Sequence, residues 1–185
     1  FMMISYRQIS RDEIDLLSQI DRTETIERVY YSPDGDQLIL HDEHWDVPDW
    51  APDNKKDRIA ALQADYDRGA TAFGAFSGDR LIGMGIVDHN FLLSGSRRLN
   101  LIGLWVSHGY RARGVGRTLV ELAAQQARKL GANILYVSAT PSENTIRFYL
   151  SIGCRPTRII DPALFAAEPE DIHLELWLVK VQHET

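Results

Sequence analysis

Apolar strands and amphipathic helices alternate through the second half of the chain, and this alternation constrains the fold more than any other feature. The predicted order is strand 71–76, strand 81–88, strand 99–106, helix 114–130, strand 134–139 and a helix that runs to 152. Ser77-Gly78-Asp79-Arg80 separates the first two strands and is typical of a hairpin turn. Hairpins combined with strand–helix–strand connections require a mixed sheet, so the sequence predicts a three-layer α/β domain.

The boundaries of the smaller elements follow from turn and capping residues. Ser10 with Glu13 forms a capping-box pattern at the start of a helix. Thr140 is the predicted N-cap of the later helix, with Pro141 at its first position. The turn signal at 32–35 predicts a hairpin between strands 28–31 and 37–40. The remaining expected elements are a strand at 3–9, a helix at 56–68 ended by Gly69, and a last strand from Ile172 to Val179.

Length, charge and the single cysteine limit the classes of function. A chain of 185 residues is expected to form one domain, 1–185. Its net charge of −6 is unsuited to a phosphate backbone, so no nucleic-acid partner is expected. Neither an apolar run of about 18 residues nor a basic leader is present, so no membrane association or signal peptide is expected. Cys154 has no partner for an intramolecular disulfide, which favours a cytoplasmic protein.

A basic, glycine-containing turn joins the strand that ends at Val106 to the helix that begins at Gly114. The first amides of a helix lack partners, and the helix dipole favours an anion there. Gly114 and Gly116 leave the backbone open to a phosphate. Arg111, Arg113 and Arg117 add positive charge to an otherwise acidic chain. These features predict a diphosphate-binding cradle, and neither the nucleoside-triphosphatase loop nor the dinucleotide fingerprint matches it.

Two linked motifs resemble those of the GNAT-type N-acetyltransferase superfamily. They are Arg111-x-x-Gly114-x-Gly116 and, downstream, Asn144, Phe148-Tyr149 and Gly153. The resemblance covers about 71–155, is loose at both ends and is absent from 21–57. It implies a three-layer GNAT-like fold, with a mixed, mostly antiparallel central sheet and helices on both faces. It also implies acetyl-CoA as cofactor, and many members of the superfamily form dimers, so a homodimer stays open.

The resemblance also assigns residues to the cofactor. The strand edge near Val106 would pair with the pantetheine arm where this strand splays from 134–139, and the amides of 111–116 would hold the pyrophosphate. A hydroxyl from Thr118 and a side-chain hydrogen bond from Asn144 would add to this. The implied cofactor-binding residues are Trp105, Val106, Ser107, Arg111, Ala112, Arg113, Gly114, Val115, Gly116, Arg117, Thr118, Asn144, Phe148 and Tyr149.

The chemistry requires an oxyanion donor, an acid and a route for the amine's proton. The amide of Val106 is the candidate donor to the oxyanion, and Tyr149 is the candidate acid for the leaving thiolate. Many relatives carry Glu or His on the strand before the cradle, but here those positions hold Asn100 and Ile102. The alternatives open to the sequence are a water chain or one of Asp88, His89, His173 and Glu175.

The insert at 21–57 has eleven acidic and four basic residues, a charge of −7, and it contains Tyr30, Tyr31, Trp45 and Trp50. Carboxylates and aromatic faces together suit an ammonium group. Glu43, Trp45 and Asp46 are therefore the candidate substrate-binding residues, expected on one short loop, for a small cationic amine. A solvated hairpin with its own small core is the equally weighted alternative.

Other chemistries have less support. The segment 41–46 holds possible metal ligands but lacks a defined ligand spacing, so no metal site is expected. Cys154 lacks a neighbouring base pattern, and no Gly-x-Ser-x-Gly motif supports a serine hydrolase. Two rival functions stay open: a protein or peptide N-acetyltransferase, and a non-catalytic acyl-CoA sensor.

Overall fold

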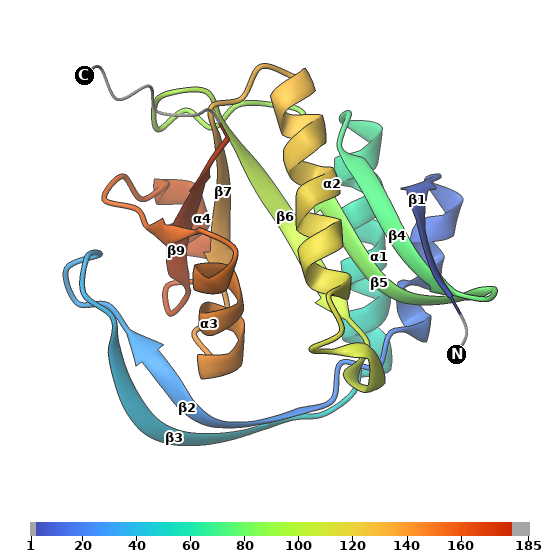
Figure 1. Ribbon diagram of the computed structural model, residues 1–185, viewed down its shortest axis with the longest axis horizontal. Helices are drawn as coiled ribbons and strands as arrows, with labels where there is room; N and C mark the ends of the chain where they lie inside the picture. The colour runs from blue at the N-terminus through green and yellow to red at the C-terminus, as the bar shows by residue number, and fades with distance from the viewer. Residues whose placement is uncertain (1–2, 179–185) are drawn as a thin grey trace.

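A seven-stranded sheet in the order β1-β4-β5-β6-β7-β9-β8 forms the centre of the molecule (Figure 1). This computed structural model describes residues 3–178, so Val179 of the predicted last strand lies outside the described residues. The strands are β1 (Ile4–Ile9), β4 (Thr71–Ser77), β5 (Arg80–Val87), β6 (Arg98–Val106), β7 (Ile134–Ala139), β8 (Arg155–Pro156) and β9 (Ile172–Trp177). Only β6 and β7 are parallel neighbours among these strands, so the predicted mixed, mostly antiparallel sheet is confirmed.

Helices cover both faces of the sheet, as predicted for a three-layer fold. The helices α2 (Val115–Lys129) and α3 (Glu143–Ser151) lie on one face, and η1 (Asp12–Gln19) and α1 (Pro52–Asp67) lie on the other (Figure 1). Each face has its own buried cluster of apolar side chains. A further short helix, α4 (Pro162–Ala167), precedes β9. None of the described helices is long and apolar enough to cross a membrane.

The best-predicted element is α2, because its apolar residues recur at helical spacing. Leu119, Ala123 and Ala127 are fully buried against the sheet. Arg128 and Lys129 occupy the last turn, where cations suit the helix dipole, and Gly131 with a φ of 83° ends the helix. Burial of this stripe fixes how α2 lies on the sheet and therefore where its amino end points.

The sheet opens between β6 and β7. These strands pair only from Arg98 to Asn100 on β6, opposite 134–136 on β7. Beyond Asn100, β6 continues to pair with β5 and leaves β7, and a register shift at 86–87 of β5 marks this departure. The predicted splay between strands 99–106 and 134–139 is thus present. We call the gap between the diverging strands, at the end of β6 that precedes α2, the slot.

The acidic insert forms a long two-stranded arm of β2 (Glu24–Tyr31) and β3 (Ile39–Val47). The arm curves away from the main sheet and passes beneath α3 (Figure 1). The amide of Tyr30 donates to the carbonyl of Pro141 at 2.7 Å. The guanidinium of Arg28 donates to both carboxylate oxygens of Glu143, at 2.8 and 2.9 Å. The predicted hairpin is confirmed, and these contacts attach it to the first turn of α3.

Three predicted helix starts differ from the structure. The N-cap of α3 is Ser142, whose hydroxyl accepts from the amide of Thr145, and not Thr140. The helix at the amino end is a 3₁₀ helix, although Glu13 does accept from the Ser10 amide at 2.9 Å. The helix predicted at 56–68 begins earlier, at Pro52. Proline is favourable in a first helical turn, which explains why α1 begins at Pro52. It also explains why Pro141 favoured Thr140 over Ser142 as the predicted N-cap of α3.

Candidate active site

The cradle predicted at the start of α2 has the geometry that an anion requires. Gly114 is the N-cap, with a φ of 83° and no side chain to cap the helix. An added Cβ at Gly114 would meet nothing within 4 Å, so space lies open before the helix. The amides of Val115, Gly116 and Arg117 lie in the first turn and lack partners within the helix. This open, positively polarised end fits a diphosphate such as that of coenzyme A.

Two side chains of the predicted cradle turn to the protein instead of the open space. The guanidinium of Arg111 donates to the carbonyls of Val106, Arg22 and Thr23 at 3.1–3.2 Å. The hydroxyl of Thr118 donates to the carbonyl of Gly114 at 3.2 Å. Both side chains therefore bond to the protein in this structure, and their roles toward the cofactor stay predictions. Arg113 and Arg117 are exposed and supply the positive charge.

The remaining cradle residues contribute mainly backbone. Ala112 is exposed and has a φ of 59°, which marks a sharp turn before the helix. Val115 is buried in the core, so only its amide is available. An added Cβ at Gly116 would lie 3.1 Å from the Phe148 ring. The cradle and α3 are therefore close neighbours, and Phe148 forms the wall between them.

The register of β5 and β6 decides which backbone groups face the slot. The amide of Ser107 donates to the carbonyl of Ile82 at 2.8 Å, which makes this a hydrogen-bonded pair. Hydrogen-bonded pairs alternate along an antiparallel ladder, so Trp105 also turns its backbone to β5. Val106 turns its amide the other way, into the slot. Of the three predicted strand residues, Val106 is the one whose backbone amide faces the slot, and the prediction that Trp105 and Ser107 also bind the cofactor stays a prediction.

The second motif lies on α3. Asn144 is exposed in its first turn, Phe148 is partly buried, and Tyr149 is buried with 6% of its surface exposed. The rings of Phe148 and Tyr149 are in edge contact, with centroids 5.0 Å apart. Burial raises the pKa of the Tyr149 phenol, and the Asp171 carboxylate raises it further. The phenol is therefore protonated at neutral pH, as an acid must be.

The predicted substrate residues lie on β3, and not on a loop. Glu43 and Trp45 share one face of the strand, and the Trp45 indole N–H donates to Glu43 at 2.6 Å. Asp46 lies on the other face, between the hydroxyl of Thr25 and the ring of His44. Trp50 is buried in the core against η1, so it is not part of an aromatic cluster with the other insert residues. The three predicted substrate-binding residues therefore lie on two different faces of β3.

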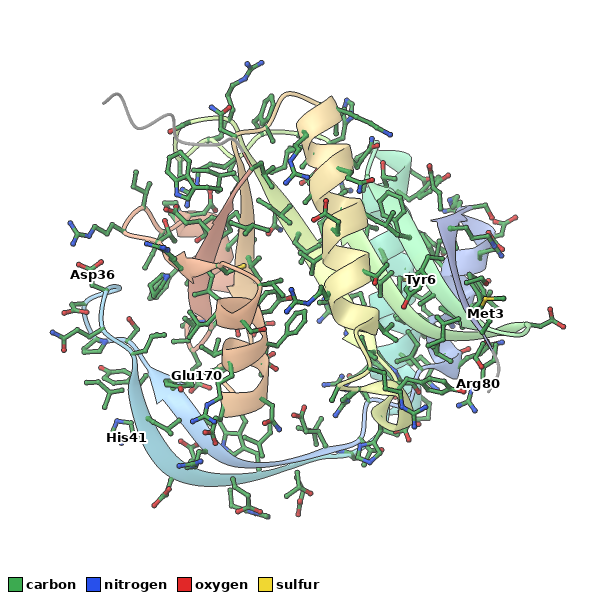
Figure 2. All side chains as sticks on the ribbon, viewed as in Figure 1. Met3, Tyr6, Asp36, His41, Arg80 and Glu170 are labelled. Carbon is green, nitrogen blue, oxygen red and sulfur yellow. The ribbon has the colours of Figure 1, made fainter. Side chains whose placement is uncertain are left out.

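Glu43 and Trp45 line a cavity of about 480 Å³ between the arm and the C-terminal part of the chain. Figure 2 labels one residue from each side, His41 on the arm and Glu170 opposite. Residues that also line it and that sequence reasoning missed as substrate-binding are His41, Phe165, Glu170 and Asp171. Only the wrapping of the arm brings these distant segments together, so no local pattern could have identified them.

The proposed alternatives for a base lie in different environments. Asp88 accepts the amides of His89 and Asn90 in a turn, and His89 is exposed. Glu175 accepts from the Trp177 indole and lies 3.9 Å from Arg98. Of these four, only His173 lines the cavity. Its Nδ1 lies 2.6 Å from the Tyr136 hydroxyl, and burial lowers its pKa.

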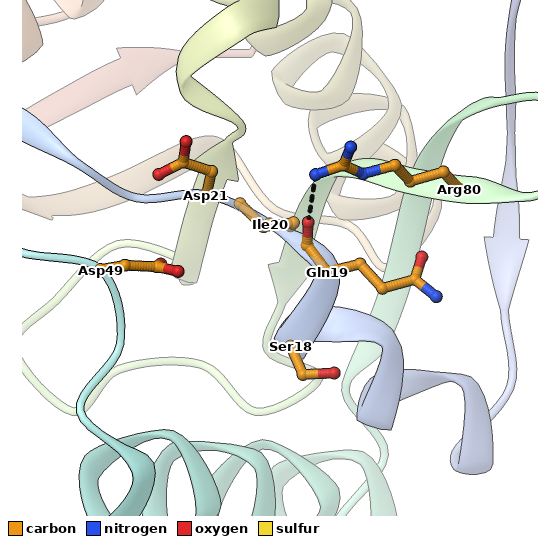
Figure 3. Close-up of a pocket in the computed structure, with 6 residues that line it drawn as sticks. All are labelled: Ser18, Gln19, Ile20, Asp21, Asp49 and Arg80. Atoms are coloured by element: carbon orange, nitrogen blue, oxygen red, sulfur yellow. Dashed lines mark hydrogen bonds between the residues drawn. The ribbon is translucent and has the colours of Figure 1, made fainter.

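A second hollow, of about 410 Å³, lies where the arm leaves η1 (Figure 3). Arg80 donates there to the carbonyl of Gln19 at 3.2 Å, and Asp21 and Asp49 lie opposite. None of its lining residues belongs to the slot, α2 or α3. The cavity beneath the arm is therefore the better candidate for an acceptor.

Metal and cysteine chemistry gain no support from the geometry. Within residues 3–178, no group of three or more His, Cys, Asp or Glu side chains is arranged to hold a metal ion. The Cys154 thiol is buried, and burial raises its pKa to about 12. A thiol protonated at neutral pH is a poor nucleophile. Cys154 therefore serves as a small core residue.

Comparisons with known proteins agree with the fold. The profile of the acetyltransferase (GNAT) family matches residues 37–153. Among curated proteins, none matches the sequence. Among solved structures, nourseothricin acetyltransferase is similar, with a TM-score of 0.66 and 22% identity over 95% of this chain and 99% of that one.

Two further structures are similar over most of their length. The PaiA N-acetyltransferase of Thermoplasma acidophilum, solved with coenzyme A, has a TM-score of 0.60 and 17% identity over 95% of this chain and 99% of its own. The ribosomal-protein-S18-alanine N-acetyltransferase of Escherichia coli has a TM-score of 0.59 and 14% identity over 99% of both chains. The family match covers well over half of the sequence, and the open helix end fits the cofactor's diphosphate. This chain therefore belongs to the GNAT family and is an acetyl-CoA-dependent N-acetyltransferase.

Proposed function

We propose that this enzyme transfers the acetyl group to the amine of a small cationic molecule, by direct attack in a ternary complex. The acceptor occupies the cavity beneath the arm, and acetyl-CoA enters the slot from the side of α2. The two ligands thus meet where β7 ends and α3 begins. Bound acetyl-CoA supplies the activated acyl group, and the residues around the slot orient it and move protons.

The observation that carries this proposal is the chemistry of the cavity. Its lining includes three carboxylates, Glu43, Glu170 and Asp171, and neither Lys nor Arg is among the described residues that line it. It also presents four large aromatic side chains, those of Tyr30, Tyr31, Trp45 and Phe165. Acidic groups next to aromatic faces attract an ammonium ion by charge and by cation–π interaction.

The proposed roles of the residues follow from their positions. The Val106 amide faces the slot and is placed to donate to the developing oxyanion. Asn144, exposed on the first turn of α3, is placed to hydrogen-bond the pantetheine arm. Tyr149 is held protonated by burial and provides the proton for the thiolate. The amides of 112–117 hold the pyrophosphate; the Arg111 amide, which the sequence prediction included, donates to the carbonyl of His108 at 3.4 Å, and the Arg117 amide lies in the first turn of α2.

A panel of acceptors tests the proposal. Thiol release from acetyl-CoA would be followed with a polyamine, a basic amino acid, a neutral primary amine, an acidic amino acid and a short peptide. The acceptors with a second positive charge should have the highest kcat/KM, because only they use the cavity carboxylates. A neutral or anionic best acceptor, or the peptide, would contradict the proposed substrate class. Binding of coenzyme A without turnover of any amine would favour the sensor.

A further inference from the structure

Acetyl transfer to an ammonium releases one proton that the enzyme must accept. An acceptor R–NH₃⁺ and acetyl-CoA give the amide R–NH–COCH₃, the free thiol and one H⁺. The strand positions where the family resemblance places a base hold Asn100 and Ile102, and neither accepts a proton at neutral pH. The Oδ1 of Asn100 is buried and, among residues 3–178, has no hydrogen-bond partner.

We propose that Asp171 accepts this proton from the acceptor ammonium. The inference rests on the proposed function, because it assumes that the acceptor occupies the cavity beneath the arm. Asp171 immediately precedes β9, and the pair Ala139–Ile172 places it beside the end of β7, where the chain turns into α3. Its side chain lines the cavity. It therefore lies between the proposed acceptor site and the helix that carries Tyr149.

The carboxylate of Asp171 is held in place on one side only. The Ser138 hydroxyl, from β7, donates to its Oδ2 at 2.8 Å. The Asp171 amide donates to the carbonyl of Glu168 at 3.2 Å, which fixes the turn before β9. Among the described residues, Ser138 is the side chain that hydrogen-bonds this carboxylate, so Oδ1 is left for a ligand. A base needs this combination of a fixed position and a free lone pair.

The other polar groups of the cavity are less suited to the role. Glu43 accepts the Trp45 indole N–H, and Glu170 is exposed. His173 is occupied at Nδ1, and its Nε2 is buried without a partner in the described part of the chain. Asp171 is the partly buried acid, and burial raises its pKa, which makes it a better proton acceptor near neutral pH.

The groups around Asp171 and Tyr149 support Asp171 as the proton acceptor and Tyr149 as the proton donor. The Asp171 carboxylate contributes to the raised pKa of the Tyr149 phenol, so the two lie within electrostatic range. Glu168 and Glu170 raise the pKa of Asp171, and Ser138 lowers it. The titratable groups that face Asp171 or share its cavity are Tyr149, Glu168, Glu170, Glu43, His41, His173, Tyr30 and Tyr31.

The proton balance closes with these two residues. Asp171 takes one proton from R–NH₃⁺, and the neutral nitrogen then forms a bond to the thioester carbonyl carbon as the C–S bond breaks. Tyr149 gives its proton to sulfur and regains one from the nitrogen. Asp171 finally releases its proton to water. No oxidant, metal or further co-reactant is needed.

Asp171→Asn tests the assignment, because the amide preserves shape and cannot accept the proton. With the best acceptor of the panel, kcat/KM near pH 7 should fall about 100-fold, the lower range for a general base. The deficit should shrink as the pH approaches the amine's own pKa of about 10, where the neutral amine forms unaided. The affinity for coenzyme A, measured by calorimetry, should not change. Glu168→Gln is the matched control, because it removes a nearby exposed carboxylate, and it should stay within about threefold of the wild type.

Ser138→Ala provides a second, milder test that retains the carboxylate. Since the Ser138 hydrogen bond lowers the pKa of Asp171, its loss should move the acidic limb of the kcat/KM profile to higher pH. An unmoved limb would overturn the assignment, as would an Asp171→Asn deficit that is the same at every pH. Equal rates for Asp171→Asn and the wild type would also overturn it, while leaving the proposed function intact. A wild type that acetylates no amine would instead contradict both.

Discussion

At the scale of single residues, the hydroxyl of Tyr149 carries the clearest expectation. The ring is buried beside Phe148, so Tyr149→Phe keeps the packing and removes only the proton donor. We expect kcat to fall by about 10²–10⁴ with little change in acetyl-CoA affinity. Because burial raises the pKa of the phenol, the basic limb of the wild-type kcat profile should lie above the ordinary phenol pKa of about 10. A kcat within a few-fold of the wild type would mean that water protonates the thiolate.

The residue types at the site were predictable, but their orientations were not. Gly114, Val106 and Asn144 were identified from motif spacing, and the structure places the first two at an open helix end and an open strand edge. Arg111 belongs to the motif of Gly114, and Thr118 follows two residues after that motif, yet both side chains bond to the protein. A spacing rule fixes where a residue lies along the backbone. It says little about which carbonyls a long guanidinium will reach.

At the scale of elements, the arm separates two acids that are close in sequence. Glu43 lines the cavity, whereas Asp46 lies on the opposite face of β3 and bonds to Thr25 and His44. Glu43→Gln should therefore raise the acceptor KM several-fold and leave the acetyl-CoA KM unchanged. Asp46→Asn is its matched control and should change neither. The effect of Glu43→Gln should weaken with salt, because exposed charges are screened beyond about 8 Å at physiological ionic strength.

The opposite result would locate the acceptor elsewhere. If Asp46→Asn raised the acceptor KM and Glu43→Gln did not, the outer face of the arm would be the binding surface. The two faces could not be assigned before the structure, since the sequence predicts a short loop around 43–46 where β3 continues to Val47. The hairpin turn itself was predictable from its Pro, Asp and Gly residues. The length and curvature of the strands depend on contacts with α3, which lies about a hundred residues later in the chain.

At the scale of the whole molecule, the side chain of Arg111 links the cofactor cradle to the arm. The Arg111 guanidinium joins the end of β6 to Arg22 and Thr23 at the arm's root. Arg111→Ala should lower the free energy of unfolding by about 1–3 kcal/mol, because it removes the Arg111 donor from the carbonyls of Val106 and Arg22. It should also weaken both acetyl-CoA and acceptor binding. Thermal melting with calorimetry for the cofactor and a kinetic KM for the acceptor would measure this.

The control is Arg113→Ala, which removes an exposed positive charge next to Tyr110. It should weaken cofactor binding alone and leave the melting temperature nearly unchanged. If Arg111→Ala also weakened cofactor binding alone and left the melting temperature nearly unchanged, Arg111 would act on the cofactor and not as the link between the cradle and the arm. The layers of the fold were predictable because each is set by local periodicity, whereas this link depends on segments almost ninety residues apart.

The departure of β6 from β7 leaves an unpaired strand edge inside the molecule, where most proteins have a continuous ladder. Exposed edges invite pairing with other chains, and this edge lies between α2 and α3 (Figure 1). Neighbouring amides on β6 should consequently exchange their hydrogens with solvent at very different rates, slowly at Trp105 and quickly at Val106. A bound pantetheine arm would complete the ladder and remove this difference. The same hydrogen bonds would therefore hold the ligand in the slot and raise the local resistance of β6 to unfolding.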